Sequence, residues 1–169
     1  MLPTATEFQL QLLRWQFFAT FTWRGGKLGS VASRSRDLFE FLRERYAEFG
    51  HSLGSRCFVV RFERGELGDR PHAHALLAGF PRATIADAFY YMHCWNEEYG
   101  YSKFARYDPQ QLGDAIGYVS KVPRSGGEGM RYELRKFDRA DRMIVSPAAW
   151  RAMCVAVGAP ASTKQHQTF

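Results

Sequence analysis

Residues 70–77 of this chain read Arg-Pro-His-Ala-His-Ala-Leu-Leu, and they decide both the expected fold and the expected chemistry. The stretch reads as a β-strand, in which successive side chains point to opposite faces. His72 and His74 therefore lie on one side, where both imidazoles can reach a single metal ion. Taken alone, two histidines at this spacing are also compatible with half-buried residues on the surface of a sheet.

A carboxylate that can complete such a site is found in the preceding apolar run, residues 57–63. The polar, Gly-rich residues 64–69 between the two runs are typical of the loop of a β-hairpin. If the two strands pair antiparallel, Glu63 projects beside His72 and His74. Two neutral imidazoles and one carboxylate can bind a divalent cation and leave positions open for water or substrate.

Other arrangements of the charged residues fit the same sequence. Glu66 and Asp69 also lie within reach of the histidines and are alternative ligands. Glu63 can instead be a surface strand residue paired with Arg61 or Arg64. The histidines therefore anchor the predicted site, and the identity of the acidic ligand stays open.

A candidate nucleophile lies in residues 113–122, which read as a short helix ending before Pro123. The apolar stripe of this helix consists of Leu112, Ala115, Ile116, Val119 and Val122. Tyr118 falls beside the stripe, and Lys121 follows on the same flank, where its ammonium can stabilise developing phenolate or phosphate charge. The same spacing also describes an exposed tyrosine beside a solvated lysine, and Tyr107, in a strand or loop, is the nearest rival nucleophile.

Residues 17–23, Phe-Phe-Ala-Thr-Phe-Thr-Trp, predict a buried first strand. Together with the histidine pair and the tyrosine helix, this strand resembles the HUH endonuclease superfamily, specifically the single-tyrosine replication initiators (Rep proteins) of rolling-circle plasmids, phages and small single-stranded DNA viruses. The family's order is a Phe-Thr-rich strand, then His-hydrophobic-His, then a helix with Tyr-x-x-Lys, and the likeness spans residues 15–125. One departure is the small Ala73 between the histidines, which points to the other face.

The resemblance implies a metal-dependent DNA endonuclease and strand transferase. In such proteins Mn²⁺ or Mg²⁺ polarises the scissile phosphate and a tyrosine attacks it in line, which leaves a 3′-hydroxyl and a 5′-phosphotyrosine bond. Carried over to this chain, the metal ligands would be His72, His74 and Glu63. The catalytic pair would be Tyr118 as nucleophile and Lys121 as the group that positions or neutralises the phosphate. The implied function is sequence-specific nicking and joining of single-stranded DNA in rolling-circle replication.

The formal net charge of +6 favours a polyanionic partner, and basic residues are interleaved with aromatic ones. The basic side chains expected to contact single-stranded DNA, at an origin hairpin or nick site, are Arg24, Lys27, Arg70, Lys103, Arg106 and Arg124. The chain has no Gly-x-x-x-x-Gly-Lys-Ser/Thr motif, so unwinding is expected from a host or separate helicase.

Three cysteines without a Cys-x-x-Cys pair favour a reducing compartment. The sequence starts without the basic lead of a signal peptide, and no apolar run approaches about 18 residues. We therefore expect an intracellular protein that does not enter a membrane, cytoplasmic or, for a eukaryotic virus, nuclear.

The succession of apolar patterns predicts an α+β fold, a central antiparallel sheet of about five strands with packed helices. The ferredoxin-like fold of the HUH endonucleases has the same architecture. Strands are expected at residues 17–23, 57–63, 72–79, 101–107 and 130–137, and helices at 33–49, from Thr84 onward, at 113–122 and at 147–157. Residues 1–158 are expected to form a single domain, and 159–169 a flexible polar tail.

The first two long helices carry apolar stripes at helical spacing. The helix at 33–49 is predicted to start at a Ser33 or Ser35 cap. Its inward residues are Leu38, Phe41, Leu42 and Tyr46. The inward residues predicted for the helix after Thr84 are Ile85, Phe89, Met92 and Trp95.

Three functions compete with the nicking enzyme. A Y1 transposase more often carries Gln or Asn where Lys121 stands. A metal-free single-stranded nucleic-acid-binding module on the same scaffold would use His72 and His74 as ordinary surface residues. A 2-His-1-carboxylate iron oxygenase usually shows His-x-Asp/Glu, and it leaves Tyr118 without a role.

Overall fold

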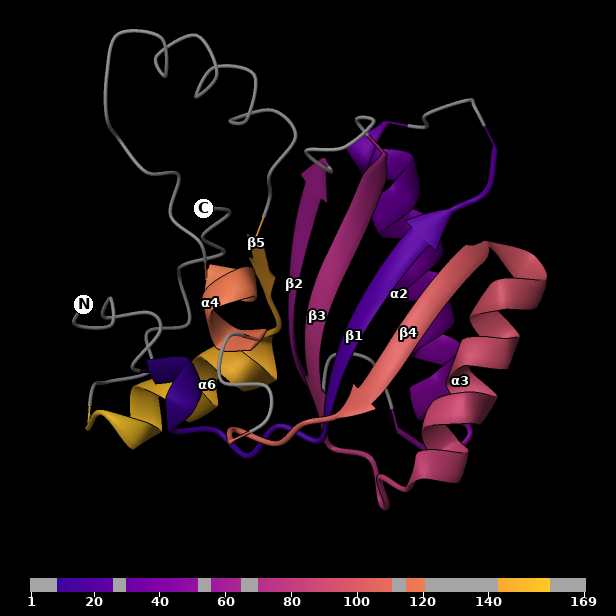
Figure 1. The fold of residues 1–169 in the computed structure, drawn as a ribbon. Helices are drawn as coiled ribbons and strands as arrows, with labels where there is room; N and C mark the ends of the chain where they lie inside the picture. The colour runs from indigo at the N-terminus through magenta and orange to yellow at the C-terminus, as the bar shows by residue number, and fades with distance from the viewer. Residues whose placement is uncertain are drawn as a thin grey trace, which may run out of the picture.

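The computed structural model describes residues 9–25, 30–51, 56–64, 70–110, 115–120 and 143–158. Its elements in chain order are β1 (Phe17–Trp23), α2 (Val31–Ala47), β2 (Cys57–Arg64), β3 (Pro71–Ala78), α3 (Ile85–Glu98), β4 (Gly100–Arg106), α4 (Ala115–Ser120), β5 (Met143–Val145) and α6 (Pro147–Ala156). The described strands form one five-stranded antiparallel sheet in the order β4-β1-β3-β2-β5. Figure 1 shows α2 and α3 on one side of this sheet and α4 and α6 on the other. The predicted α+β fold is confirmed.

The strand that carries the histidines, β3, is the central strand of the sheet, as predicted. The first four strands lie where the apolar runs place them, with ends that differ by at most one residue. The strand predicted at 130–137 and the tail predicted at 159–169 lie outside the described residues. The fifth strand of the sheet is Met143–Val145, which pairs with β2 and was not predicted. Three residues are too few for an alternating pattern to be recognised.

The larger core lies between the sheet and the helices α2 and α3. The stripe predicted for α2, which is Leu38, Phe41, Leu42 and Tyr46, is fully buried there. From β1, Phe21 meets Trp95 of α3 edge to face, with ring centroids 4.7 Å apart. Such a pair contributes about 0.5–1.5 kcal/mol beyond the burial of its surface. Aromatic packing therefore fixes both helices against this face of the sheet.

Of the two predicted helix N-caps, one is confirmed and the other is wrong. Thr84 caps α3 as predicted, and it forms a capping box with Asp87. The cap of α2 is Ser30, whose side chain accepts a hydrogen bond from the backbone N–H of Ser33, so the predicted Ser33 or Ser35 cap is wrong. The helix begins earlier because Ser30 satisfies one of the free N–H groups of its first turn.

The face that α3 turns to the core also differs from the prediction. Trp95 is buried and Met92 packs, partly buried, against the core, as predicted, but Ile85 and Phe89 are 65% and 64% exposed. The residues that α3 buries are Ala88, Tyr91 and Trp95. The Tyr91 ring packs against the rings of Phe17, Phe80 and Phe104. The inward face of the helix is therefore centred on Ala88, Tyr91 and Trp95, because this aromatic cluster accepts Tyr91 in place of Phe89.

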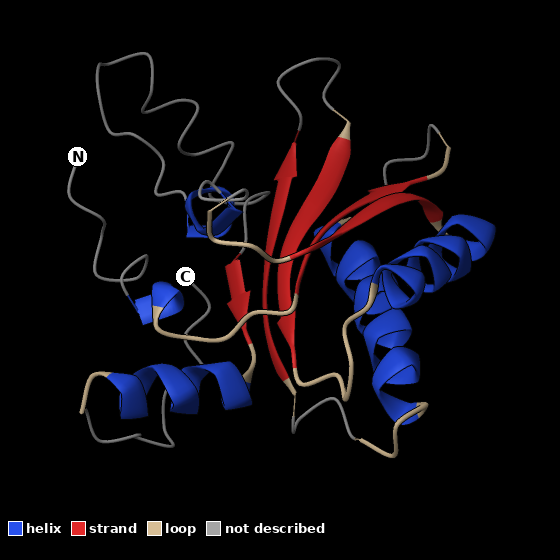
Figure 2. Ribbon diagram, turned by 60° about the horizontal axis from the view of Figure 1, so that its bottom comes forward, coloured by secondary structure: helices blue, strands red, loops and turns tan. Residues whose placement is uncertain are grey.

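A smaller core lies on the opposite face, where α4 and α6 pack against β2 and β3 (Figure 2). Ala115, Ile116 and Val119 of α4 are buried in it, as predicted. The two ends of the predicted stripe, Leu112 and Val122, lie outside the described residues. This second core covers one part of the face, and the histidines of β3 lie on the same face beyond it.

Candidate metal centre

The pairing of β2 with β3 brings the three predicted metal ligands together. Glu63 lies opposite His72 in this antiparallel register, and Arg61 lies opposite His74. Opposed residues, and residues two apart in one strand, share a face, so all four side chains project from one side of the sheet. One ligand atom each of Glu63, His72 and His74 lies within 4.8 Å of the other two. These residues therefore form a possible metal-binding group.

One oxygen of the Glu63 carboxylate lies near both imidazoles. Its Oε2 is 3.4 Å from Nε2 of His72 and 3.8 Å from Nε2 of His74. The three side chains are mostly buried, with between 13% and 19% of their surface exposed. The alternative acidic ligands, Glu66 and Asp69, lie outside the described residues. Within the described part of the chain, Glu63 is the carboxylate that the geometry places with the histidines.

Each histidine has a partner at its other ring nitrogen. Nδ1 of His72 lies 3.2 Å from the backbone oxygen of Arg70, a contact in which the ring N–H donates. Nδ1 of His74 lies 3.0 Å from Oγ1 of Thr20. When Nδ1 carries the hydrogen and donates it, Nε2 keeps the lone pair that a metal ion needs. Phe18 also stacks on His74, with ring centroids 5.6 Å apart and planes inclined by 10°.

Arg61 is a member of the site that sequence reasoning named only as an alternative partner of Glu63. Its Nε lies 3.7 Å from Oε1 of Glu63, and the residue is only 8% exposed. Glu63 therefore contacts the arginine through one oxygen and the histidines through the other. The predicted contact with Arg61 and the predicted approach to the histidines are thus both present in the fold.

The donor set fits a divalent cation. Imidazole nitrogens and a carboxylate oxygen suit first-row ions such as Mn²⁺, Fe²⁺ or Zn²⁺, and the carboxylate suits Mg²⁺. The partners on Nδ1 of His72 and His74 are the outer contacts that orient ligating histidines in metalloproteins. Three protein ligands leave positions for water or for an oxygen of a substrate, which is the arrangement of catalytic rather than structural metal sites.

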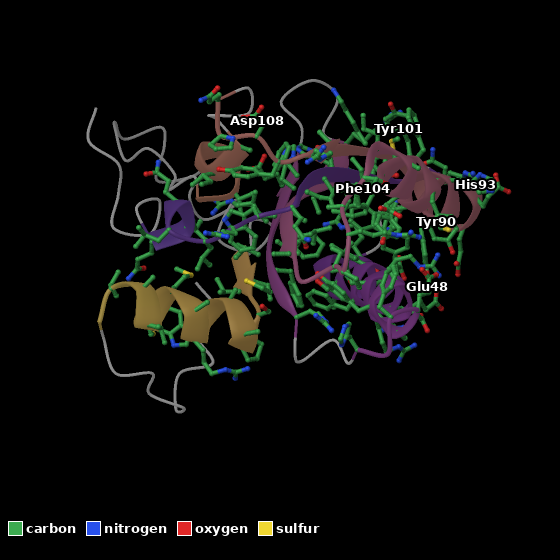
Figure 3. All side chains as sticks on the ribbon, turned by 90° about the horizontal axis from the view of Figure 1, so that it is seen from below. Glu48, Tyr90, His93, Tyr101, Phe104 and Asp108 are labelled. Carbon is green, nitrogen blue, oxygen red and sulfur yellow. The ribbon has the colours of Figure 1, made fainter. Side chains whose placement is uncertain are left out.

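Two cross-strand rows extend this group across the sheet. One row runs Arg61, His74, Thr20 and Lys103, and the next runs Glu63, His72, Thr22 and Tyr101. Lys103 is exposed, and Tyr101 is 66% exposed. In Figure 3, Tyr101 lies at the margin of the molecule, whereas Phe104 lies among packed side chains on the other face of β4. The face with the metal-binding group therefore also presents a cation and an aromatic ring.

The helix of the predicted nucleophile lies on the face of the histidines. Ile116 and Val119 of α4 pack with Leu76, which follows His74 by two residues on the same side of β3. Tyr118 belongs to α4, but its side chain lies outside the described part of the structure, as does the whole of Lys121. The fold thus places α4, the helix that contains Tyr118, on the metal-binding face. The position of the phenol itself is not described.

The six predicted DNA-contacting residues occupy different positions. Arg70 directly precedes β3, and Arg24 follows β1, where its guanidinium donates to the backbone oxygen of Asn96. Lys103 lies in the row of His74. Arg106 is opposite Phe17 in the register, on the face of the sheet that α2 and α3 cover and away from the histidines. The two remaining residues, Lys27 and Arg124, lie outside the described residues.

Burial affects two other groups that can act as nucleophiles. It raises the pKa of the Tyr107 phenol, the rival nucleophile in the sequence. It also raises the pKa of the Cys57 thiol to about 11. Both groups therefore stay protonated at neutral pH, which makes them weak nucleophiles and poor metal ligands.

Comparison with known proteins yields no match among protein-family models, curated proteins or solved structures. The class that fold and site define is thus an α+β protein with a possible two-histidine, one-carboxylate metal group on the central strand of its sheet. Within the described residues, none of the helices combines the length and apolar character that crossing a membrane requires.

Proposed function

We propose that this protein is a metal-dependent enzyme that nicks and rejoins single-stranded DNA through a tyrosine, in the initiation of rolling-circle replication of a plasmid, phage or small virus. The observation that carries the proposal is the convergence of Glu63, His72 and His74 on the sheet face against which α4 packs. The resemblance to HUH endonucleases supplies the reaction. The geometry is compatible with it.

In this proposal His72, His74 and Glu63 hold Mn²⁺ or Mg²⁺. The bound ion supplies Lewis-acid charge to a non-bridging oxygen of the scissile phosphate. The protein's part is to present three ligands from two paired strands, with the imidazoles oriented through Thr20 and the backbone of Arg70. Such a site needs little rearrangement when the substrate enters, because its ligands are fixed by strand register.

Tyr118 is the proposed nucleophile. A bond forms between its phenolic oxygen and phosphorus, and the bond between phosphorus and the 3′ oxygen breaks. The phenol loses a proton and the departing oxygen gains one, so a 3′-hydroxyl and a 5′-phosphotyrosine result. The ammonium of Lys121 offsets negative charge on the phosphate. Attack by that 3′-hydroxyl, or by another, reverses the step and joins strands.

The DNA is proposed to cross the two rows that extend from the metal-binding group to β4. Lys103 can contact a phosphate there, and the exposed ring of Tyr101 can stack on a base. Arg70 and Arg24 flank the same end of β3 and β1 and add positive charge. Strand separation is assigned to a separate helicase, because the chain has no phosphate-binding loop of its own.

A metal-free single-stranded nucleic-acid-binding module is the second candidate. The contact between Arg61 and Glu63 favours it, since it gives the carboxylate a cation without any metal. The exposed Tyr101 and Lys103 serve binding equally well in both proposals. The two functions differ in whether a covalent bond to DNA forms.

A covalent adduct with DNA tests the proposed reaction. The protein is incubated with a pool of mixed single-stranded oligonucleotides and Mn²⁺, and denaturing gels are searched for a protein–DNA conjugate. We expect a conjugate that EDTA prevents and that Tyr118→Phe abolishes. The matched control is Tyr107→Phe, which removes the rival hydroxyl and should leave the conjugate unchanged.

The outcomes separate the candidates. A conjugate that persists in Tyr118→Phe and disappears in Tyr107→Phe would identify Tyr107, directly after β4, as the nucleophile. Retention of the oligonucleotides in native gels without any conjugate, with or without Mn²⁺, would contradict the nicking enzyme and favour the binding module.

A further inference from the structure

The outer edge of β4 carries backbone groups that none of the described strands uses. Tyr107, the residue after β4, donates its backbone N–H to the oxygen of Gln16 on the β1 side. Hydrogen-bonded and non-bonded positions alternate along an antiparallel pair, so the N–H and C=O groups of Ser102, Phe104 and Arg106 point away from β1. Because β4 is an edge strand of the described sheet, these groups face outward.

Helix α3 covers one half of this edge and leaves the other half open. Oδ1 of Asn96 accepts hydrogen bonds from the backbone N–H of Ser102 at 2.8 Å and from its hydroxyl at 3.1 Å. The Asn96 side chain thus takes the place of a neighbouring strand at Ser102. Among the described residues, none does the same for the outward N–H of Phe104 or of Arg106. The open part of the edge therefore runs from Phe104 to Arg106.

A row of exposed apolar side chains lies on α3 beside the open part of the edge. Ile85 and Phe89 precede Asn96 by whole helical turns, so all three share the flank of α3 that faces the edge of β4. Both apolar residues are mostly exposed. Tyr90 lies on the other flank, where its hydroxyl donates to Glu48 at the end of α2. Because α3 and β4 run in opposite directions (Figure 1), Ile85 and Phe89 lie toward the end of β4 that is open.

We propose that this edge binds an extended peptide segment of a partner protein, which joins the sheet as a further strand and carries alternating apolar and acidic side chains. The backbone of Phe104 and Arg106 pairs with the peptide backbone. Apolar side chains of the peptide pack on Ile85 and Phe89. The alternate side chains project to the other face of the sheet, where Lys103 is exposed. This inference goes beyond the proposed function and is independent of the metal site.

The charges at the edge favour an acidic peptide over a second copy of this chain. Lys103 and Arg106 are exposed cations on β4 itself. If the β4 strands of two copies paired about a two-fold axis, these cations would approach their own counterparts, and like charges on paired strands are destabilising. Glu97 and Glu98 of α3 are turned about 100° or more away from the flank of Asn96, so they do not offset the cations of the edge.

Fluorescence anisotropy with synthetic peptides of about eight residues, a usual strand length, tests the site. In one set Val, Ile, Leu or Phe alternates with Glu, and in the matched set Lys replaces Glu. The tightest acidic peptide is also made in two N-methylated forms, on its odd or on its even residues, because an added strand uses only every second N–H. The full chain is compared with Ile85→Ser and Phe89→Ser. Val155→Ser on α6 is the matched control, since it also removes an exposed apolar side chain.

We expect the tightest acidic peptide to bind with a micromolar Kd, at least about tenfold more tightly than its lysine counterpart. Ile85→Ser and Phe89→Ser should each weaken binding about fivefold to tenfold, and Val155→Ser should leave it unchanged. One N-methylated form should bind like the parent peptide and the other about tenfold more weakly. In nuclear magnetic resonance, the bound peptide should slow amide exchange at Phe104 and Arg106, because both N–H groups gain acceptors.

Absence of binding by every acidic peptide, or equal affinity of the acidic and lysine peptides, would overturn the proposal. So would a dimer of the protein alone that Phe89→Ser dissociates in sedimentation, which would assign the edge to a second copy. Release of the peptide by oligothymidylate, with equal loss of oligothymidylate binding in Phe89→Ser, would assign the edge to DNA instead. None of these results bears on the nicking activity, which the adduct assay tests separately.

Discussion

Thr20 on β1 lies directly opposite His74 on β3, and its hydroxyl oxygen is 3.0 Å from Nδ1 of that imidazole. This contact holds the hydrogen on Nδ1 and the lone pair on Nε2 when a metal is bound. Thr20→Val keeps the shape of the side chain and removes the partner. We expect it to weaken Mn²⁺ binding about tenfold in calorimetry. Thr22→Val is the matched control, because the Thr22 hydroxyl donates to the backbone oxygen of Tyr101 and not to a histidine. Equal loss in both variants would show that the contact with His74 has no special role.

The ligands themselves give a second prediction. His72→Ala, His74→Ala and Glu63→Ala each remove one ligand from the group and should each lower Mn²⁺ affinity at least about tenfold. Exposed residues of α3 provide matched controls, His93→Ala and Glu97→Gln, which should leave the affinity unaltered. Normal Mn²⁺ binding by Glu63→Ala would transfer the acidic ligand to Glu66 or Asp69.

Metal binding should also stabilise the folded protein. An ion that binds the native state at about 100 times its Kd adds about 2.7 kcal/mol, because the unfolded chain does not assemble the ligands. We expect Mn²⁺ with oligothymidylate to raise Tm in a thermal scan and EDTA to reverse the shift. His74→Ala should show no metal-dependent part of the shift. A shift of equal size in that variant would mean that the ion binds elsewhere.

The capping box of α3 predicts a dependence of stability on acid. Hydrogen bonds from the Thr84 side chain and backbone hold the pKa of Asp87 below its usual value. Because the folded-state pKa is lowered, this stabilisation is complete above the unfolded pKa of about 4 and is lost as the pH falls through the folded-state pKa. Thr84→Ala should cost about 1 kcal/mol at neutral pH. Urea titrations from neutral to acidic pH should show a shallower acid loss for Asp87→Ala than for the parent, and equal slopes would contradict the role of the carboxylate.

Gly100 allows a test of how tightly β4 approaches β1. A Cβ added to Gly100 would collide with the backbone oxygen of Thr22 and come within 2.8 Å of the nitrogen of Arg24. Gly100→Ala should therefore cost about 1–3 kcal/mol, because backbone cannot move aside easily. Gly25→Ala is the comparison, since its Cβ meets no atom within 4 Å and its cost comes only from a φ of +86°, about 1 kcal/mol. Denaturant titrations measure both, and a larger loss at Gly25 would contradict the close approach.

The central part of this site could be predicted because it is local. Glu63, His72 and His74 lie on adjacent strands that are close in the sequence, so alternation and antiparallel pairing are enough to bring them together. Thr20 and Phe18 are more than fifty residues away in the sequence. Their contacts with His74 depend on the register of β1 against β3, which no local pattern contains.

The errors in the predicted fold also come from contacts between residues that are distant in the sequence. Phe89, Tyr90 and Tyr91 are three consecutive aromatic residues in α3, and helical periodicity is satisfied by more than one of them. The aromatic cluster of β1 and β4 selects Tyr91. The partner of Glu63 was ambiguous for a different reason, since a carboxylate has two oxygens and the fold uses both.

The central position of β3 affects how easily the strand that bears the histidines can open. Both edges of this strand are hydrogen-bonded, to β1 on one side and to β2 on the other. Amide hydrogens of such a strand exchange with solvent mainly when the whole domain opens, whereas ends and edges exchange through local fraying. His74, in the interior of β3, therefore belongs to a slowly exchanging segment, whereas His72 lies next to the end of the strand, where fraying is easier. In the proposed metal site, an ion is then expected to leave by ligand exchange, without unfolding of the strand that bears the histidines.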